Sequence, residues 1–332
     1  MIAGATNGSS RRPQLNAIKL GALVREHRGA ADDIEPDVAG EFGNGAALML
    51  DHVAWVLLDE QPERGLGAAL AWAVRRNATE LHVLASRATG LLARRAGGFG
   101  YPISVWHVEG RTLQPAVAEP LPVSPALAAE HGEFLATIVE GGGLPLVEHG
   151  VLAGEVQGLE VCRVITDPHT QAVRLEVGVG AHDREAFQLL HGDRPTVEAL
   201  ADVVRAVGEH RRPGARRHPL NLLAQERALR ARVIADPALV GATLVEAVEP
   251  PVPRTNVKDA VPCVAAATID GRLVALVCSS GVDIDVVPFA IDARSALGVD
   301  ECLVVLPARD ALDIQQRLAG LADPPITVVA VG

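Results

Sequence analysis

The chain has 332 residues, a net charge of −11 and 48% hydrophobic residues. This length predicts more than one domain, and the apolar content excludes a disordered chain. A net negative charge disfavours a general nucleic-acid-binding protein, because a phosphate backbone attracts positive charge. No apolar run reaches the roughly 18 residues of a membrane span, and the first residues lack the apolar core of a signal peptide. We therefore expect a soluble cytoplasmic protein.

The lysines and the cysteines of the chain are also informative about the class of protein. Lys19 and Lys258 are the only lysines, so nearly all positive charge is arginine, a composition typical of a bacterium with a GC-rich genome. The cysteines show no C-x-x-C spacing and lie in apolar runs, which favours buried thiols over disulfides or zinc ligands. These cysteines are Cys162, Cys263, Cys278 and Cys302.

The first third of the chain predicts an α/β unit. Residues 1–13 are rich in polar residues and glycine and predict a flexible tail, and residues 14–113 predict an N-terminal unit. Apolar periodicity predicts helices over 15–27, 65–76 and 89–97, and strands over 46–50, 53–58, 80–85 and 103–108. After the first helix the order is β-β-α-β-α-β, which favours a mixed sheet covered by helices.

The middle of the chain predicts a linker and a smaller section. Prolines in 114–128 and a helix over 126–140 predict a linker and helix across 114–143, which ends at three glycines. Residues 144–218 predict a β-hairpin from strands 158–166 and 172–179, followed by a helix over 196–210.

The last section, residues 219–332, repeats the order of the first. A helix over 219–235 precedes a hairpin of strands 263–269 and 273–278, which turns at Asp270-Gly271. Helices over 285–297 and 311–321 then alternate with strands 302–306 and 326–331. The β-β-α-β-α-β order therefore occurs twice. We interpret the repeat as an internal duplication, although short α/β units also resemble one another without common origin.

A strand hairpin preceded by a helix and followed by α-β-α-β resembles the core of the PD-(D/E)xK, restriction-endonuclease-like superfamily. That resemblance implies an aspartate on one strand and an acidic-x-lysine motif on the next, which together hold a divalent metal. Here the second unit has Val277-Cys-Ser-Ser280, without acid or lysine, and the first has Leu58-Asp-Glu-Gln61, with Asp51 on the preceding strand. The resemblance therefore implies a degenerate, non-catalytic relative.

A second group of carboxylates lies in the middle section. Glu160 and Glu176 occupy neighbouring strands of the predicted hairpin, and a short polar run follows its end. Carboxylates and an imidazole at a strand end could bind Mg²⁺ or Mn²⁺. The alternative is a half-exposed hairpin followed by a solvated helix start. The metal-site candidates are Glu160, Glu176, His182, Asp183 and Glu185, with Asp51 and Asp59 of the first unit.

One basic run offers an anion site. Residues 211–218 contain four arginines, which could bind phosphate or an acidic partner, or could form a solvated linker. These anion-site candidates are Arg211, Arg212, Arg216 and Arg217. The chain contains neither a phosphate-binding P-loop nor a serine-hydrolase G-x-S-x-G motif.

We therefore expect a non-catalytic binding or scaffolding protein with a degenerate nuclease-like fold. The alternatives are a metal-dependent nuclease or phosphodiesterase, and an oligomeric small-molecule sensor. The apolar content is compatible with a homodimer.

Overall fold

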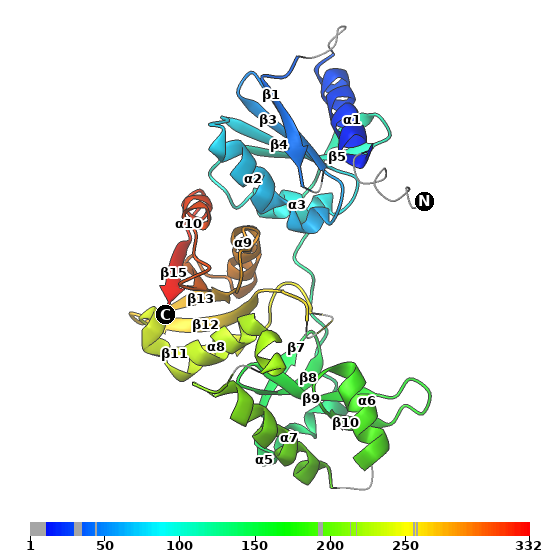
Figure 1. Ribbon diagram of the computed structural model, residues 1–332, viewed down its shortest axis with the longest axis vertical. Helices are drawn as coiled ribbons and strands as arrows, with labels where there is room; N and C mark the ends of the chain where they lie inside the picture. The colour runs from blue at the N-terminus through cyan, green and yellow to red at the C-terminus, as the bar shows by residue number, and fades with distance from the viewer. Residues whose placement is uncertain are drawn as a thin grey trace, which may run out of the picture. The chain divides into compact units, whose positions relative to one another are not determined.

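The computed structural model describes residues 11–29, 35–43, 45–191, 195–212, 214–216, 218–254, 256 and 258–332. It is an α/β protein with mixed sheets, as predicted (Figure 1). The chain forms two compact units. Unit 1 comprises the described residues up to Leu121, with Ile284–Asp292 and Leu312–Thr327; unit 2 comprises the rest. The predicted C-terminal section 219–332 is thus divided between the two units.

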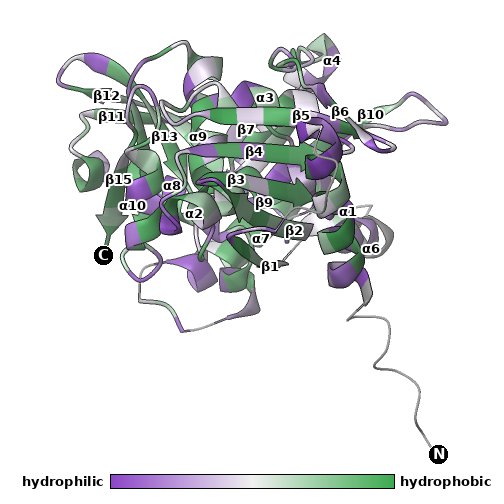
Figure 2. Ribbon diagram, turned by 90° about the horizontal axis from the view of Figure 1, so that it is seen from above, coloured by the Kyte–Doolittle hydropathy of each residue, from purple (hydrophilic) through white to green (hydrophobic). Residues whose placement is uncertain are grey.

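Unit 1 contains a six-stranded sheet in the order β1-β2-β3-β4-β5-β6. Strands β3, β4 and β5 are parallel and run side by side (Figure 2), and the other pairs are antiparallel. The β2–β3 hairpin turns at Asp51 and His52, whose φ angles of 51° and 61° suit a tight hairpin turn. The strands are β1 (Val38–Phe42), β2 (Gly45–Leu50), β3 (Val53–Leu58), β4 (Glu80–Ala85), β5 (Ile103–Glu109) and β6 (Thr112–Pro115). The sequence did not predict β6, and for residues 29–44, which contain β1, it predicted a loop or an irregular strand.

The apolar face of helix α1 (Arg11–Arg28) packs on this sheet. Leu20, Leu23 and Val24 recur at the spacing of one helix face and pack on Trp55 and neighbouring strand residues. Three residues of the predicted tail therefore belong to the helix, since Pro13 is tolerated in a first turn. The remainder of that tail, residues 1–10, lies outside the described residues. The other helical segments before Leu121 are η1 (Pro62–Arg64), α2 (Leu66–Arg75) and α3 (Thr89–Ala96).

Two distant segments complete unit 1. The Gly67 N–H of α2 donates to Asp285 Oδ1 at 2.8 Å, and a Cβ at Gly67 would lie 2.3 Å from the Ile284 carbonyl oxygen. Only glycine permits this approach. A short antiparallel bridge between Phe99 and Ala322 joins the segment after α3 to the segment after α10 (Asp313–Ala319).

A buried ion-pair network reinforces the same connection. Asp292 is 1% exposed and accepts from Arg94 Nε at 2.8 Å and from Arg95 Nε at 2.7 Å. Arg95 also donates to the Glu63 carbonyl at 3.0 Å and lies 3.5 Å from Asp285. Hydrogen bonding to Asp292 raises the pKa of Arg94. Charges buried this far from water hold the segments together only while they remain paired.

Unit 2 begins with a four-stranded antiparallel sheet in the order β10-β9-β8-β7. The predicted hairpin is confirmed as β9 and β10, but the sequence missed β7 and β8. The strands are β7 (Leu144–Glu148), β8 (Val151–Val156), β9 (Leu159–Thr166) and β10 (Val173–Val177). The helices of this part are α4 (Ala129–Gly132), α5 (Leu135–Glu140), α6 (Gly180–His191) and α7 (Thr196–Arg211). The predicted helix 126–140 is therefore two short helices, with Glu133 and Phe134 between them.

The five-stranded sheet has the order β11-β12-β13-β14-β15. Its first three strands are antiparallel, and β13 and β14 are parallel. Asp270 and Gly271 form the predicted turn, with φ angles of 49° and 75°. The elements of this section are η2 (Pro219–Leu222), α8 (Gln225–Ala235), η3 (Pro237–Val240), β11 (Leu244–Val248), β12 (Cys263–Ile269), β13 (Arg272–Cys278), α9 (Val286–Leu297), β14 (Cys302–Pro307), α10 and β15 (Thr327–Val331). The predicted helix 219–235 is broken at Ala224, which has a φ of 45°.

The same element order occurs twice in the structure, with one strand more in each segment than in the predicted β-β-α-β-α-β order. A helix, three antiparallel strands and an α-β-α-β segment occur first from α1 to β5 and again from α8 to β15. A common origin of the two segments remains a proposal.

The four cysteines are free and buried, as predicted. Among the described residues, no helix is both long and apolar enough to cross a membrane.

Candidate functional site

Nine charged side chains gather in unit 2, where the four-stranded sheet meets α6, α8 and the segment at Pro253. We call them the arginine–glutamate cluster. It comprises Glu148, Glu155, Glu160 and Glu176 from the four strands, Arg163 from β9, Arg184 from α6, Arg227 and Arg230 from α8, and Arg254.

Helix α8 supplies the most deeply buried charges. Arg227 binds both Glu148 and Glu155, and Arg230 donates to each of these carboxylates at 3.2 Å. The two arginine side chains are 7% and 1% exposed. Burial raises the pKa of Glu155, but the guanidinium groups outweigh burial and hold that pKa below its usual value. The helix comes this close to β8 because the β8–β9 turn contains Gly158, where a Cβ would lie 2.2 Å from the Arg227 backbone.

Glu160 is the second centre of the cluster. It binds Arg163 in a bidentate manner, with Nε at 2.9 Å and Nη2 at 2.8 Å, and accepts from Arg184 Nη1 at 3.0 Å. Arg184 Nε lies 3.5 Å from Glu176, whose other interactions are with Arg174 on the same strand. Arg184 therefore connects the two carboxylates that the sequence placed on neighbouring strands.

Arg254 differs from the other arginines of the cluster. Its side chain is 6% exposed, yet it makes no hydrogen bond with any residue that the structure describes. The nearest carboxylate oxygen is Glu160 Oε2 at 3.9 Å, and Glu160 is already bound by Arg163 and Arg184. Burial, followed by repulsion from Arg227, lowers the pKa of Arg254. With five arginines and four glutamates, the cluster has one surplus positive charge.

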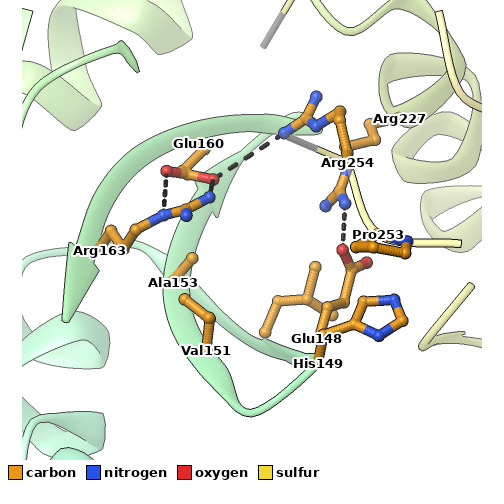
Figure 3. A pocket seen from close by; sticks show the side chains of 10 residues that line it. Glu148, His149, Val151, Ala153, Glu160, Arg163, Arg227, Pro253 and Arg254 are labelled. Atoms are coloured by element: carbon orange, nitrogen blue, oxygen red, sulfur yellow. Dashed lines mark hydrogen bonds and ion pairs between the residues drawn. The ribbon is translucent and has the colours of Figure 1, made fainter. Parts of the chain in front are cut away.

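Two cavities of about 100 Å³ each share Glu160, Arg163 and Arg254 as walls. Figure 3 shows the first, around which Glu148, Arg227 and the ring of His149 also lie. The second is closed by Arg184, Asn256 and the first residues of α6. His149 Nε2 is buried without a hydrogen-bond partner among the described residues. Each cavity has room for roughly three water molecules, at about 30 Å³ each.

The other metal-site candidates do not join this cluster. Asp183 Oδ2 accepts the Val179 N–H at 2.7 Å, and His182 and Glu185 are exposed side chains 3.9 Å apart. In unit 1, Asp51 pairs with Arg28, and Asp59 binds Arg12 and Asn16. Within the described ranges, no three histidine, cysteine, aspartate or glutamate side chains form a group that could hold a metal ion. The geometry thus gives no support to a metal at Glu160, Glu176 or these other candidates.

The predicted basic run is also not the main cationic site. Arg211 donates to the carbonyl oxygens of Gln157, Leu220 and Leu223 at 2.7–3.1 Å, so it fastens the end of α7 to the next segment. Arg212 and Arg216 are exposed, and Arg217 lies outside the described residues. None of the arginines of the cluster was a site candidate from the sequence. One available signal was the spacing of Arg227 and Arg230, which places both on the same helix face as apolar Val233.

Comparison of the chain with protein-family models, curated proteins and solved structures finds no match. The fold and the cluster define an α/β protein with two small, arginine-lined cavities. The resemblance to restriction-endonuclease-like proteins stays a prediction from the order of elements.

Proposed function

We propose that this protein binds a ligand without catalysing a reaction, and that the cavities of the arginine–glutamate cluster are its binding site. One observation carries the proposal: every glutamate of the cluster is paired with a guanidinium, while Arg254, on the wall of both cavities, lacks a hydrogen bond to the described residues. Carboxylates held in this way are poor ligands for a metal cation, because each would first have to leave its arginine.

Cys162 and Cys302 give no nucleophile. Burial raises the pKa of Cys162 to about 12 and that of Cys302 to about 12. A thiol attacks as its thiolate, so these two cysteines stay unreactive at neutral pH.

A serine, a histidine and a glutamate lie together beside the first cavity, but their geometry differs from that of a catalytic triad. Ser124 Oγ lies 3.4 Å from His149 Nδ1, and Glu249 Oε1 lies 3.7 Å from the same nitrogen. A triad needs the serine and the carboxylate on opposite nitrogens, so that the imidazole can pass a proton between them. This trio therefore supports a structural contact at the wall of the cavity.

The competing function is a metal-dependent nuclease or phosphodiesterase. We would incubate the protein with Mg²⁺ or Mn²⁺ and single-stranded DNA, duplex DNA, RNA or bis-p-nitrophenyl phosphate. The expected result is no hydrolysis above the buffer control. Hydrolysis that Glu160→Gln abolishes and that Glu185→Gln retains would overturn the proposal, because Glu185 is an exposed carboxylate outside the cluster.

A further inference from the structure

The second cavity combines four sources of positive potential. Arg163, Arg184 and Arg254 form part of its wall, and the N-terminus of α6 enters through Gly180. The first N–H groups of a helix have no partner within the helix, and the helix dipole places partial positive charge at this end. Among the described residues that line it, Glu160 supplies the one carboxylate. A cavity with this balance of charge favours an anion.

The lack of a hydrogen-bond partner for Arg254 among the described residues is a second, independent observation that points to a ligand in this cavity. Leaving a buried guanidinium without a hydrogen-bonded counterion is strongly unfavourable. Arg163 and Arg184 satisfy part of their donors with Glu160, but Arg254 reaches that carboxylate only at 3.9 Å. Arg184 Nε also has no hydrogen bond among the described residues. Two guanidinium groups on the same cavity therefore have donors that no described residue accepts, and one of them, Arg184 Nε, is fully buried.

We propose that this cavity binds a small oxyanion, a phosphate or carboxylate group, and that Arg254 is its principal ligand. The proposal rests on the proposed binding function and gives it a ligand class. Guanidinium groups match the paired oxygens of both anions, and one bound negative charge would balance the surplus positive charge of the cluster. A volume of about 100 Å³ suits the anionic group itself, so the rest of a larger ligand would extend outside the cavity.

The first test is isothermal titration calorimetry of the whole chain with inorganic phosphate, acetate and glycerol phosphate, at an ionic strength kept constant with chloride. We expect saturable binding of at least one of these anions, and the comparison identifies a free phosphate, a carboxylate or a phosphate monoester. Absence of binding by all three would overturn the proposal. Binding of an oligonucleotide alone would also overturn it, in favour of a nucleic-acid surface.

Arg254→Met is the decisive variant, because the proposal and a structural role predict opposite results. Removing an unsatisfied buried charge should raise the melting temperature without ligand, while anion affinity falls at least tenfold. The control is Arg205→Met, which removes an arginine 69% exposed on α7 and should leave affinity unchanged. Equal affinity in the wild type and Arg254→Met would show binding elsewhere and overturn the proposal.

Glu160→Gln provides a second variant with the opposite charge effect. It adds one uncompensated positive charge to the cavity, so its melting temperature should rise more with phosphate than that of the wild type. A smaller rise would contradict the assignment. Failure of anion binding without metal-dependent hydrolysis would overturn the ligand class and leave the non-catalytic function standing. Hydrolysis would overturn the proposed function itself.

Discussion

Replacing Asp292 by asparagine should destabilise unit 1 severely. Asp292 is 1% exposed and is the shared acceptor of Arg94 and Arg95, so the variant leaves two guanidinium groups short of one negative charge. Removing one partner of a buried ion pair costs about 3–5 kcal/mol. Some relaxation is available, since Arg94 also donates to the carbonyl oxygens of Glu119 and Pro120 at 3.0–3.1 Å. We therefore expect the substitution to lower the free energy of unfolding by about 4 kcal/mol.

Urea denaturation followed by tryptophan fluorescence measures this cost. Trp55, Trp72 and Trp106 are the only tryptophans, and all three lie in unit 1, so the signal reports on that unit. With a slope of about 2 kcal/mol per molar urea, a loss of about 4 kcal/mol lowers the midpoint by about 2 M.

The matched control is Asp51→Asn. It makes the same chemical change in an ion pair with Arg28 in which both side chains are exposed, at 70% and 42%. Its cost should stay below about 1 kcal/mol, and asparagine tolerates the positive φ of this turn position. If the urea midpoint of Asp292→Asn is no lower than that of the control, and the slope is unchanged, the buried ion-pair network does not stabilise unit 1 and the prediction is refuted.

Three further predictions concern packing, pH and thiols. Gly67→Ala should destabilise unit 1 by about 1–3 kcal/mol through overpacking. Gly21→Ala, on α1, has open space around the added methyl group and should stabilise unit 1 by about 1 kcal/mol. Urea denaturation of both variants measures these opposite changes. The pKa of Glu155 is lower in the native protein than the ordinary glutamate value of about 4.3. Its contribution to stability is therefore complete above that ordinary value and is lost as the pH falls through the lower native pKa. Circular dichroism at fixed urea should therefore show unit 2 losing stability below about pH 4.3, and constant stability down to pH 2 would contradict this. Cys162 and Cys302 should resist maleimide at pH 8 until a denaturant is added, and rapid labelling of native protein would show that they are not buried.

Local signals in the sequence were sufficient for much of the fold. The Asp270-Gly271 turn and the alternating helices and strands required only neighbouring residues, and the structure confirms them. Strands β7 and β8 were missed because Pro145 and Gly154 are unfavourable inside a strand. The structure tolerates Pro145 because β7 is at the edge of its sheet. It requires Gly154 because a Cβ there would lie 2.6 Å from Cys162 Sγ.

Glu160 and Glu176 of the cluster could be named from the sequence, but the net charge around them could not. The register places Glu176 opposite Arg163 and Glu160 opposite Glu155 of β8, so the two carboxylates do not face one another across the hairpin and are connected through Arg184. Arg163 is only three residues from Glu160, but Arg184 and Arg254 come from other segments, and no local pattern encodes those ion pairs. The sequence therefore predicted a cation at carboxylates, whereas the complete cluster carries surplus positive charge and favours an anion.

The order of synthesis follows from the discontinuity of unit 1. Its sheet is finished by Pro115, but Asp285 and Asp292, which bind Gly67, Arg94 and Arg95, emerge about 170 residues later. At about 5–20 residues per second, a ribosome needs roughly 10–30 s to supply them. During that interval we expect the nascent sheet to expose the apolar surface of α2, and Arg94 and Arg95 lack their shared carboxylate. Unit 1 can therefore complete its folding only after Asp285 and Asp292 have been synthesised. We expect the chain to need a chaperone during this interval.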